Sequence, residues 1–134
     1  MTIALVESPH YRLTLDPVCA EDRVPSVAFD IAVELQMPFQ RATLLVKECW
    51  FSHEQLNSFE AGLLNLLSAE HGTAKLINLS EKPILQLTRE GNSLRTVFSM
   101  SDTLSMAETT FTFNGYAAEL DQVHRNLSSY EKWW

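Results

Sequence analysis

Alternation between apolar and polar side chains over residues 27–35 is the strongest constraint on how this chain folds. Five apolar residues recur there at a spacing of two: Val27, Phe29, Ile31, Val33 and Leu35. Because successive side chains of a β-strand point to opposite faces, the pattern predicts a long strand with one buried and one solvated face. Such a strand needs neighbours to pair with and a layer that covers its apolar side.

Composition and charge limit the class of protein. A chain of 134 residues with 46% hydrophobic and 20% charged residues predicts a single domain, 1–134, with an apolar core. The net charge of −7 comes without a basic cluster, so we expect no nucleic-acid partner. A basic protein partner fits this charge, and so does an acidic surface that serves solubility alone.

The cysteines and the N-terminus bear on localisation. Cys19 and Cys49 are too few for a disulfide framework, which favours a reducing compartment. Residues 1–6 lack a basic stretch followed by an apolar run, so no signal peptide is expected. No apolar stretch is long enough to cross a membrane. The sequence therefore predicts a cytoplasmic protein without membrane contact.

Several shorter patterns predict the strands of the first half. Residues 10–15 alternate as a short strand that Asp16-Pro17 ends, and residues 16–25 are typical of a loop. A turn at residues 38–40 makes residues 42–50 the hairpin partner of the long strand. In that partner the alternation places Cys49 on the face opposite Leu44 and Val46.

A helix is predicted to start at Ser52, because Ser52-His53-Glu54-Gln55 matches a capping box. Its apolar stripe consists of Leu56, Phe59, Leu63, Leu66 and Leu67. Gly72 is placed for a left-handed cap. Gly62 lies inside the helix, either as a tolerated surface glycine or where the helix approaches the sheet closely.

The second half returns to a period of two. Residues 84–89 and 94–99 flank a central Gly91-Asn92 that suits a tight hairpin turn, and residues 107–113 form one more strand. Asn114 or Gly115 is expected to cap a closing helix with an amphipathic stripe to Tyr130. The whole pattern predicts an α+β fold in which one antiparallel sheet of about six strands is packed by two amphipathic helices, in the order strands, helix, strands, helix.

No reaction centre is indicated. Cys49 and His53 are four residues apart, but a zinc site or a cysteine nucleophile needs partners that no motif supplies, and a cysteine in an apolar strand usually serves packing. We therefore predict no catalytic residues, no cofactor, no metal and no enzymatic activity.

Five residues are candidates for partner binding. Asp30, Glu34 and Glu108 lie on polar strand faces, where they form either an ordinary solvated face or an acidic patch for a basic protein, if the two strands are neighbours. Trp133 and Trp134 either pack within the chain or anchor an interface.

The segment from Leu45 to Met100 carries a family resemblance. A strand leads through Cys49-Trp50-Phe51-Ser52 into a leucine-rich helix, and Glu81-Lys82-Pro83 opens a later strand. From residue 27 onward the chain resembles small bacterial immunity proteins against wall-associated, contact-dependent polymorphic toxins, and uncharacterised relatives that share the strand–helix pattern. The resemblance implies a non-enzymatic antiparallel α+β domain. It carries over no functional residue, and Trp133-Trp134 departs from the pattern.

We therefore predict a protein-binding domain, an immunity protein that neutralises a toxin by occlusion. The alternatives are a small ligand-binding module and a self-associating accessory protein, and either a monomer or a homodimer fits the sequence.

Overall fold

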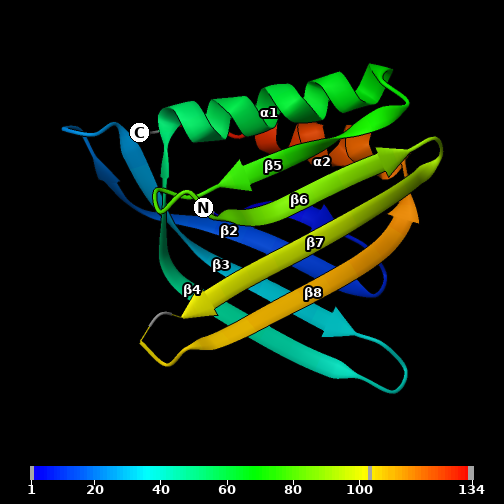
Figure 1. Cartoon of the computed structure of the whole chain (residues 1–134), viewed down its shortest axis with the longest axis horizontal. Helices are drawn as coiled ribbons and strands as arrows, with labels where there is room; N and C mark the ends of the chain where they lie inside the picture. The colour runs from blue at the N-terminus through cyan, green and yellow to red at the C-terminus, as the bar shows by residue number, and fades with distance from the viewer. Residues whose placement is uncertain (1, 103, 133–134) are drawn as a thin grey trace. The chain divides into compact units, whose positions relative to one another are not determined.

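The computed structural model describes residues 2–102 and 104–132, which form two antiparallel four-stranded sheets and two helices. In chain order the elements are β1 (Ile3–Glu7), β2 (Tyr11–Glu21), β3 (Ser26–Gln36), β4 (Arg41–Ser52), α1 (His53–Ser68), β5 (His71–Ile77), β6 (Pro83–Glu90), β7 (Ser93–Asp102), β8 (Ala107–Tyr116) and α2 (Glu119–Ser128). The α+β class, the antiparallel pairing and the two helices are confirmed. The expectation of one sheet of about six strands is wrong, because the strands on either side of α1 pair only among themselves, as β1-β2-β3-β4 and β5-β6-β7-β8 (Figure 1).

Two features of the first sheet departed from the sequence pattern. The strand β1 (Ile3–Glu7) is not among the strands expected from the sequence, which begin at residue 10. The strand β2 continues through Pro17 to Glu21, so the predicted loop over 16–25 is wrong for its first half. The register between β2 and β3 shifts between Pro17 and Cys19. A bulge is one of the few places where a strand accepts proline, which has no N–H to donate.

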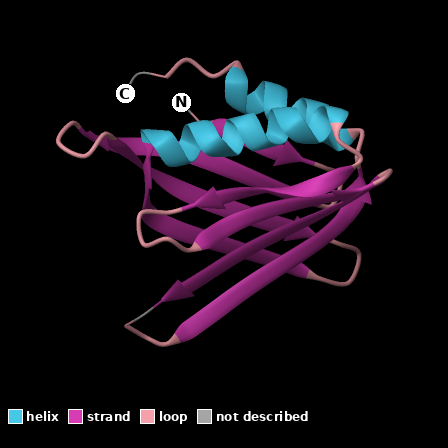
Figure 2. Ribbon diagram, turned by 45° about the horizontal axis from the view of Figure 1, so that its top comes forward, coloured by secondary structure: helices cyan, strands magenta, loops and turns pink. Residues whose placement is uncertain are grey.

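The described chain divides into two compact units. The first unit contains residues 1–53 and 122–134, and thus β1 to β4 with most of α2. The second contains residues 54–121, and thus nearly all of α1 with β5 to β8. Most of α1 is therefore grouped with the sheet that follows it in the chain, and most of α2 with the first sheet, which is distant from it in sequence. Figure 2 distinguishes the helices in cyan from the strands in magenta.

The apolar face of the first sheet follows the alternation that the sequence shows. The long strand is confirmed as β3, and it pairs with β4 as the expected hairpin. Val27, Ile31 and Val33 are fully buried. The rings of Phe29 and Phe51 meet across the two strands with centroids 6.0 Å apart at 59°.

The helix α2 joins this unit through the edge strand β1. Leu5 is the extra residue where the register between β1 and β2 shifts, and its carbonyl accepts a hydrogen bond of 3.2 Å from Asn126 Nδ2. The helix thus satisfies a strand carbonyl that the bulge removes from the ladder. The predicted cap at Asn114 or Gly115 is wrong: both residues lie in β8, and α2 begins at Glu119.

In the second unit, α1 covers the apolar face of its sheet. Four residues of its apolar stripe are buried: Leu56, Phe59, Leu63 and Leu66. The fifth, Leu67, is half-buried. A Cβ atom at Gly62 would stand 3.3 Å from the Cβ of Ala74 on β5. The close approach of helix to sheet is therefore the correct one of the two interpretations of Gly62. Figure 1 shows α1 lying along β5.

A guanidinium holds the C-terminal end of α1. Arg89 on β6 donates from Nη1 to the carbonyls of Leu66 (2.6 Å) and Leu67 (3.3 Å), and from Nε to the carbonyl of Gly91 (2.8 Å). A cation at this end also complements the helix dipole. The expected cap at Gly72 is wrong, because α1 ends at Ser68 and Gly72 lies within β5.

The hairpin between β6 and β7 is confirmed, with Gly91 and Asn92 as its two turn residues. Of the two, only Gly91 has positive φ, at 60°. Glycine at the first central position with positive φ is typical of a type II′ turn, whose twist matches that of the strands. The Gly91 amide also donates to the Glu70 carbonyl at 2.7 Å, so the turn is tied to the α1–β5 connection.

Overpacking the contact between α1 and β5 should destabilise the fold. We expect Gly62→Leu to lower the free energy of unfolding by about 1–3 kcal/mol, because the new side chain meets Ala74. Urea denaturation followed by circular dichroism measures it. The exposed neighbour Ala61→Leu is the control, with an expected change within about 0.5 kcal/mol. Equal effects of the two substitutions would contradict the close approach.

Removing the Arg89 guanidinium from the end of α1 should lower the free energy of unfolding more than removing an exposed arginine. We expect Arg89→Ala to lower the free energy of unfolding by about 1.5–3 kcal/mol, since three carbonyls lose a charged donor. Arg95→Ala, on an exposed position of β7, should change it by less than about 0.5 kcal/mol. Arg89→Lys keeps the charge but loses the forked geometry, so its stability should fall between those of the parent and Arg89→Ala.

Candidate functional site

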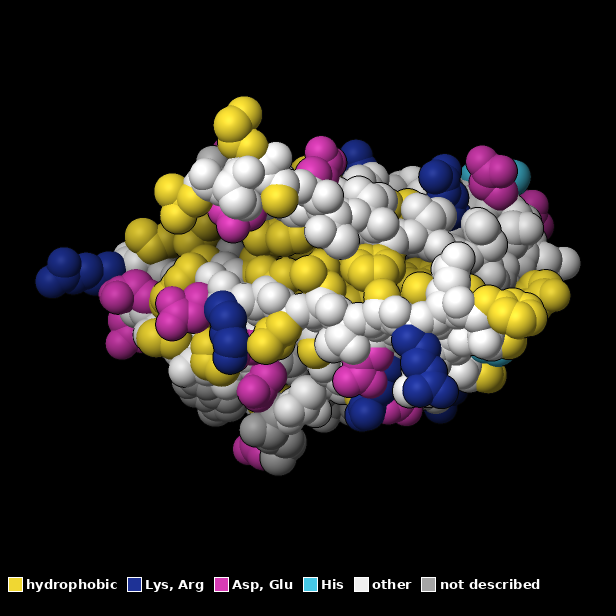
Figure 3. Space-filling model, turned by 90° about the horizontal axis from the view of Figure 1, so that it is seen from below, with side chains coloured by type: hydrophobic (Ala, Val, Ile, Leu, Met, Phe, Trp, Pro, Cys, Tyr) yellow, Lys and Arg dark blue, Asp and Glu magenta, His cyan; other side chains and the backbone are white. Residues whose placement is uncertain are grey.

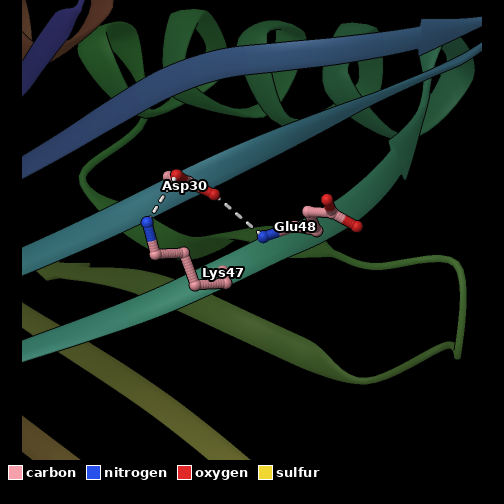
Figure 4. Close-up of polar contacts among 3 residues, drawn as sticks. All are labelled: Asp30, Lys47 and Glu48. Atoms are coloured by element: carbon pink, nitrogen blue, oxygen red, sulfur yellow. Dashed lines mark hydrogen bonds and ion pairs between the residues drawn. The ribbon is translucent and has the colours of Figure 1, made fainter.

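A β-bulge on β4 organises the outer face of the first sheet. The register between β3 and β4 shifts between Phe29 and Ile31, so that Asp30 faces both Lys47 and Glu48. Asp30 Oδ1 accepts from the Glu48 amide at 3.0 Å, and Oδ2 accepts from Lys47 Nζ at 3.4 Å (Figure 4). Glu48 has φ of 50°, a conformation that residues other than glycine seldom adopt. The carboxylate of Asp30 therefore holds a strained turn of the strand in place.

The bulge also changes which side chains of β4 face the core. Leu44 and Val46 pair with Val33 and Ile31, and after the extra residue Cys49 pairs with Phe29. Since these partners are all buried, Cys49 lies on the same face as Leu44 and Val46. The prediction that Cys49 faces the opposite side is wrong, because one inserted residue reverses the parity of every side chain that follows.

Electrostatics at this point favour the ionised carboxylate. The pKa of Asp30 lies below its ordinary value, chiefly because the Glu48 amide donates to the carboxylate; burial opposes this shift, and Lys47 supports it through its hydrogen bond and its charge. Asp30 thus has a structural role in addition to any contact it makes with a partner.

Acidic side chains from two neighbouring strands, β2 and β3, lie on this outer face. Asp16 on β2 is the direct cross-strand partner of Asp30, and Arg12 is the partner of Glu34. Two carboxylates opposite each other on neighbouring strands repel. Sequence reasoning missed Asp16 because Pro17 suggested that the strand ended there; the alternation of Leu13 and Leu15 was the available signal.

Thr14, Ala32 and Leu45 form the cross-strand row between the Asp16–Asp30 pair and the Arg12–Glu34 pair. Ala32 pairs with Leu45 of β4, and the Leu45 side chain is 53% exposed. We call the outer surface formed by Asp16, Asp30, Ala32, Glu34 and Leu45 the carboxylate face. An apolar centre with a charged surround is the usual anatomy of a protein-binding surface.

Basic side chains moderate this negative charge. Arg12 Nη2 pairs with Glu7 Oε1 at 3.2 Å, and Lys47 pairs with Asp30. In each pair at least one of the two side chains is largely exposed to solvent. Such exposed ion pairs are weak, so they neutralise the negative potential of this face only in part. In the view of Figure 3, acidic and basic side chains are interspersed rather than separated into fields of one sign.

The remaining predicted binding residues do not extend the carboxylate face. Glu108 lies on β8, in the second sheet, so β3 and β8 are not paired neighbours and the three acids do not tile one sheet. A single acidic patch from Asp30, Glu34 and Glu108 was expected only if the two strands were neighbours in one sheet, and that condition is not met. Trp133 and Trp134 lie outside the described residues.

Glu108 instead borders a hollow of about 350 Å³ in the second unit. Lys82 and Glu108 are its charged residues, and Lys82 Nζ donates to Ser101 Oγ at 3.2 Å. The rest of the lining is mostly polar: Asn78, Ser80, Pro83, Ile84, Gln86, Ser99, Met100 and Ser101. Ligand pockets of this size are usually lined by apolar side chains with few polar groups, so the hollow resembles them only in volume.

The sequence analysis considered Cys49 and His53 for metal binding and for nucleophilic chemistry. Cys49 is 4% exposed within the core, where a free cysteine packs as a small apolar side chain. The Nε2 atom of His53 is buried and has no hydrogen-bond partner among the described residues. Within 2–102 and 104–132, no three histidine, cysteine or acidic side chains are grouped so as to hold a metal ion.

Comparisons add no family to this description: the chain matches no protein-family model and no curated protein. In the part of the chain that the structure describes, neither helix has the length and apolar character needed to cross a membrane.

Loss of the Asp30 carboxylate should weaken the fold in a pH-dependent way. Since the pKa of Asp30 is lower in the folded chain, its carboxylate stabilises the fold above the unfolded-state pKa, and this contribution is lost as the pH falls through the folded-state pKa. We expect Asp30→Asn to unfold at lower urea concentration than the parent at neutral pH, and the difference to shrink in acid. Glu34→Gln, at an exposed position of the same strand, removes a carboxylate that makes no bulge contact and is the control, with an expected change in the free energy of unfolding within about 0.5 kcal/mol at neutral pH.

Proposed function

We propose that this chain is a non-enzymatic protein-binding domain that uses the carboxylate face to engage a cationic protein. The observation that carries the proposal is the placement of Asp16 directly opposite Asp30. Because Lys47 and the Glu48 amide hold the carboxylate of Asp30, a lysine or arginine of a partner would bring a countercharge to the opposing carboxylate of Asp16. The exposed Leu45 beside them supplies apolar area for the centre of a contact.

The acidity of the whole chain supports the same partner chemistry. A net charge of −7 attracts a basic protein over a distance and raises the rate of encounter at low ionic strength. Glu34, exposed at one end of the carboxylate face, would act in this steering, while the partly buried Asp30 would contribute in the formed complex.

The resemblance of the chain from residue 27 onward to immunity proteins gives this binding a role. We propose that the cationic partner is a toxin domain and that the carboxylate face blocks its active site, in the cytoplasm of a bacterial cell. Occlusion requires no reactive group on this chain, and a substrate-binding surface that recognises anions would be blocked well by clustered carboxylates.

Charge reversal on the carboxylate face tests the site. A tagged chain is used to capture partners from the native cell lysate at low salt, and proteins eluted at high salt are identified by mass spectrometry. With the purified partner, Asp16→Lys combined with Glu34→Lys should lower the association rate at least about tenfold at low ionic strength, and the difference should narrow as salt rises. Both positions leave the Asp30 bulge contacts in place.

A matched control comes from the second sheet. Glu108→Lys changes the net charge by the same amount as one of these substitutions but lies outside the carboxylate face, so its effect on the association rate should be small. If Glu108→Lys slowed association as much as the double variant, the net charge and not this face would control binding. Capture of no basic protein would count against the proposal.

The hollow beside Glu108 favours a second candidate function, the binding of a small polar ligand. Its volume of about 350 Å³ and its two lining residues of opposite charge, Lys82 and Glu108, suit a zwitterionic molecule. A thermal-shift screen of polar metabolites tests it, since a ligand of the folded chain raises the melting temperature. Loss of that rise in Lys82→Ala would place the ligand in the hollow.

A further inference from the structure

Four strands form the edges of the two sheets, and three of them are protected against pairing with another chain. The strand β1 has only five residues, contains a bulge and bonds to α2 through Leu5. The strand β4 is interrupted by the bulge at Glu48 and carries the exposed Lys47. The strand β5 has seven residues, a register shift near its end and the exposed Lys75. Short length, bulges and lysines are the usual protections of an edge.

The fourth edge, β8, has none of these protections. Its ten residues pair continuously with β7 from Ala107 to Tyr116 without any irregularity. Its sequence holds no lysine, arginine or proline, and Glu108 is its one charged residue. Threonine and phenylalanine alternate over residues 110–113, a composition that favours strands. Among the described residues no strand pairs with its outer side, and six of its ten residues are exposed.

Exposed apolar side chains stand at both ends of this strand. Met106, in the turn before β8, is 90% exposed, and Tyr116, its last residue, is 73% exposed. Single exposed side chains are common, but these two lie in line with an unprotected edge. An antiparallel arrangement of two such strands brings the start of one beside the end of the other, so each Met106 would meet a Tyr116.

We propose that β8 is a self-association edge, at which a second copy of this chain pairs antiparallel with β8 around a twofold axis. Because partners across an antiparallel pair share a sheet face, the two strands are centred on one residue, and we place that centre at Phe111. Met106 then faces Tyr116 of the second copy, and Thr110 faces Thr112 of the second copy. Each contact occurs twice, as a twofold interface requires.

Symmetry and charge both agree with this direction. In the antiparallel arrangement Glu108 faces Asn114 of the second copy, so the carboxylates of the two copies stay apart. Two copies of the same edge can run parallel only if one sheet is turned over, which places residues of equal number on opposite faces. Growth beyond two copies is opposed because the far edge of this sheet is β5, with its register shift and Lys75.

Sedimentation velocity of the full chain over a range of concentrations tests the proposal. We expect a reversible monomer–dimer equilibrium. Thr110→Lys combined with Thr112→Lys, both at exposed positions of β8, should weaken dimerisation at least about tenfold. Thr43→Lys, at an exposed position of the protected edge β4, is the matched control and should dimerise as the parent does. Circular dichroism and urea denaturation confirm that each variant is folded.

Disulfide trapping tests the register, and it remains informative if the lysine variants do not fold. In a Cys19→Ser background, which removes the exposed native thiol, Thr110→Cys is mixed with Thr112→Cys under mild oxidation. Facing residues of an antiparallel pair lie at disulfide distance, so the mixed dimer should form in excess over either homodimer. A chain that stays monomeric at all concentrations, larger oligomers, loss of dimer in Thr43→Lys alone, or equal trapping of all pairs would each overturn the proposal.

Discussion

The contact between Asp30 and the bulged strand β4 sets the character of the first sheet. The extra residue at Glu48 requires positive φ, and the carboxylate of Asp30 holds it by accepting from its amide. Without that residue the parity of β4 would reverse, and Cys49 and Phe51 would turn from the core to the solvent. The burial of the last residues of β4, and the point at which α1 begins, therefore depend on the hydrogen bond between Asp30 and Glu48 on the outer face of the sheet.

The same polar surface carries the proposed function. An aspartate that served the bulge alone would not need a second aspartate opposite it, yet Asp16 occupies that position. The two requirements are compatible because Asp30 directs its oxygens along β4 towards Lys47 and Glu48, while Asp16 approaches from β2. The carboxylate face thus combines a fixed group with one whose interactions a cationic partner can complete.

The two sheets resolve the problem of exposed edges differently. Bulges interrupt every strand pair of the first sheet, so its edges are twisted and irregular. In the second sheet the pairs β6–β7 and β7–β8 run without interruption, which leaves β8 as an edge strand without a bulge. The regular sheet is fastened to α1 by Arg89 and by the close contact at Gly62, so its regularity does not depend on its outer edge. An unbroken edge on a rigid sheet is a suitable surface for strand pairing.

The sequence by itself determined the α+β class, the long strand β3, the hairpin turn at Gly91 and the apolar stripe of α1, because alternation, helical spacing and glycine conformation are local properties. The division into two sheets, the continuation of β2 through Pro17 and the inward position of Cys49 were decided by tertiary structure. Asp30 and Glu34 were found from the alternation of β3, whereas Asp16 became visible only once the register of β2 on β3 was known. Register and bulges depend on pairing between residues far apart in the chain, and a single strand's pattern contains no information about its partner's phase.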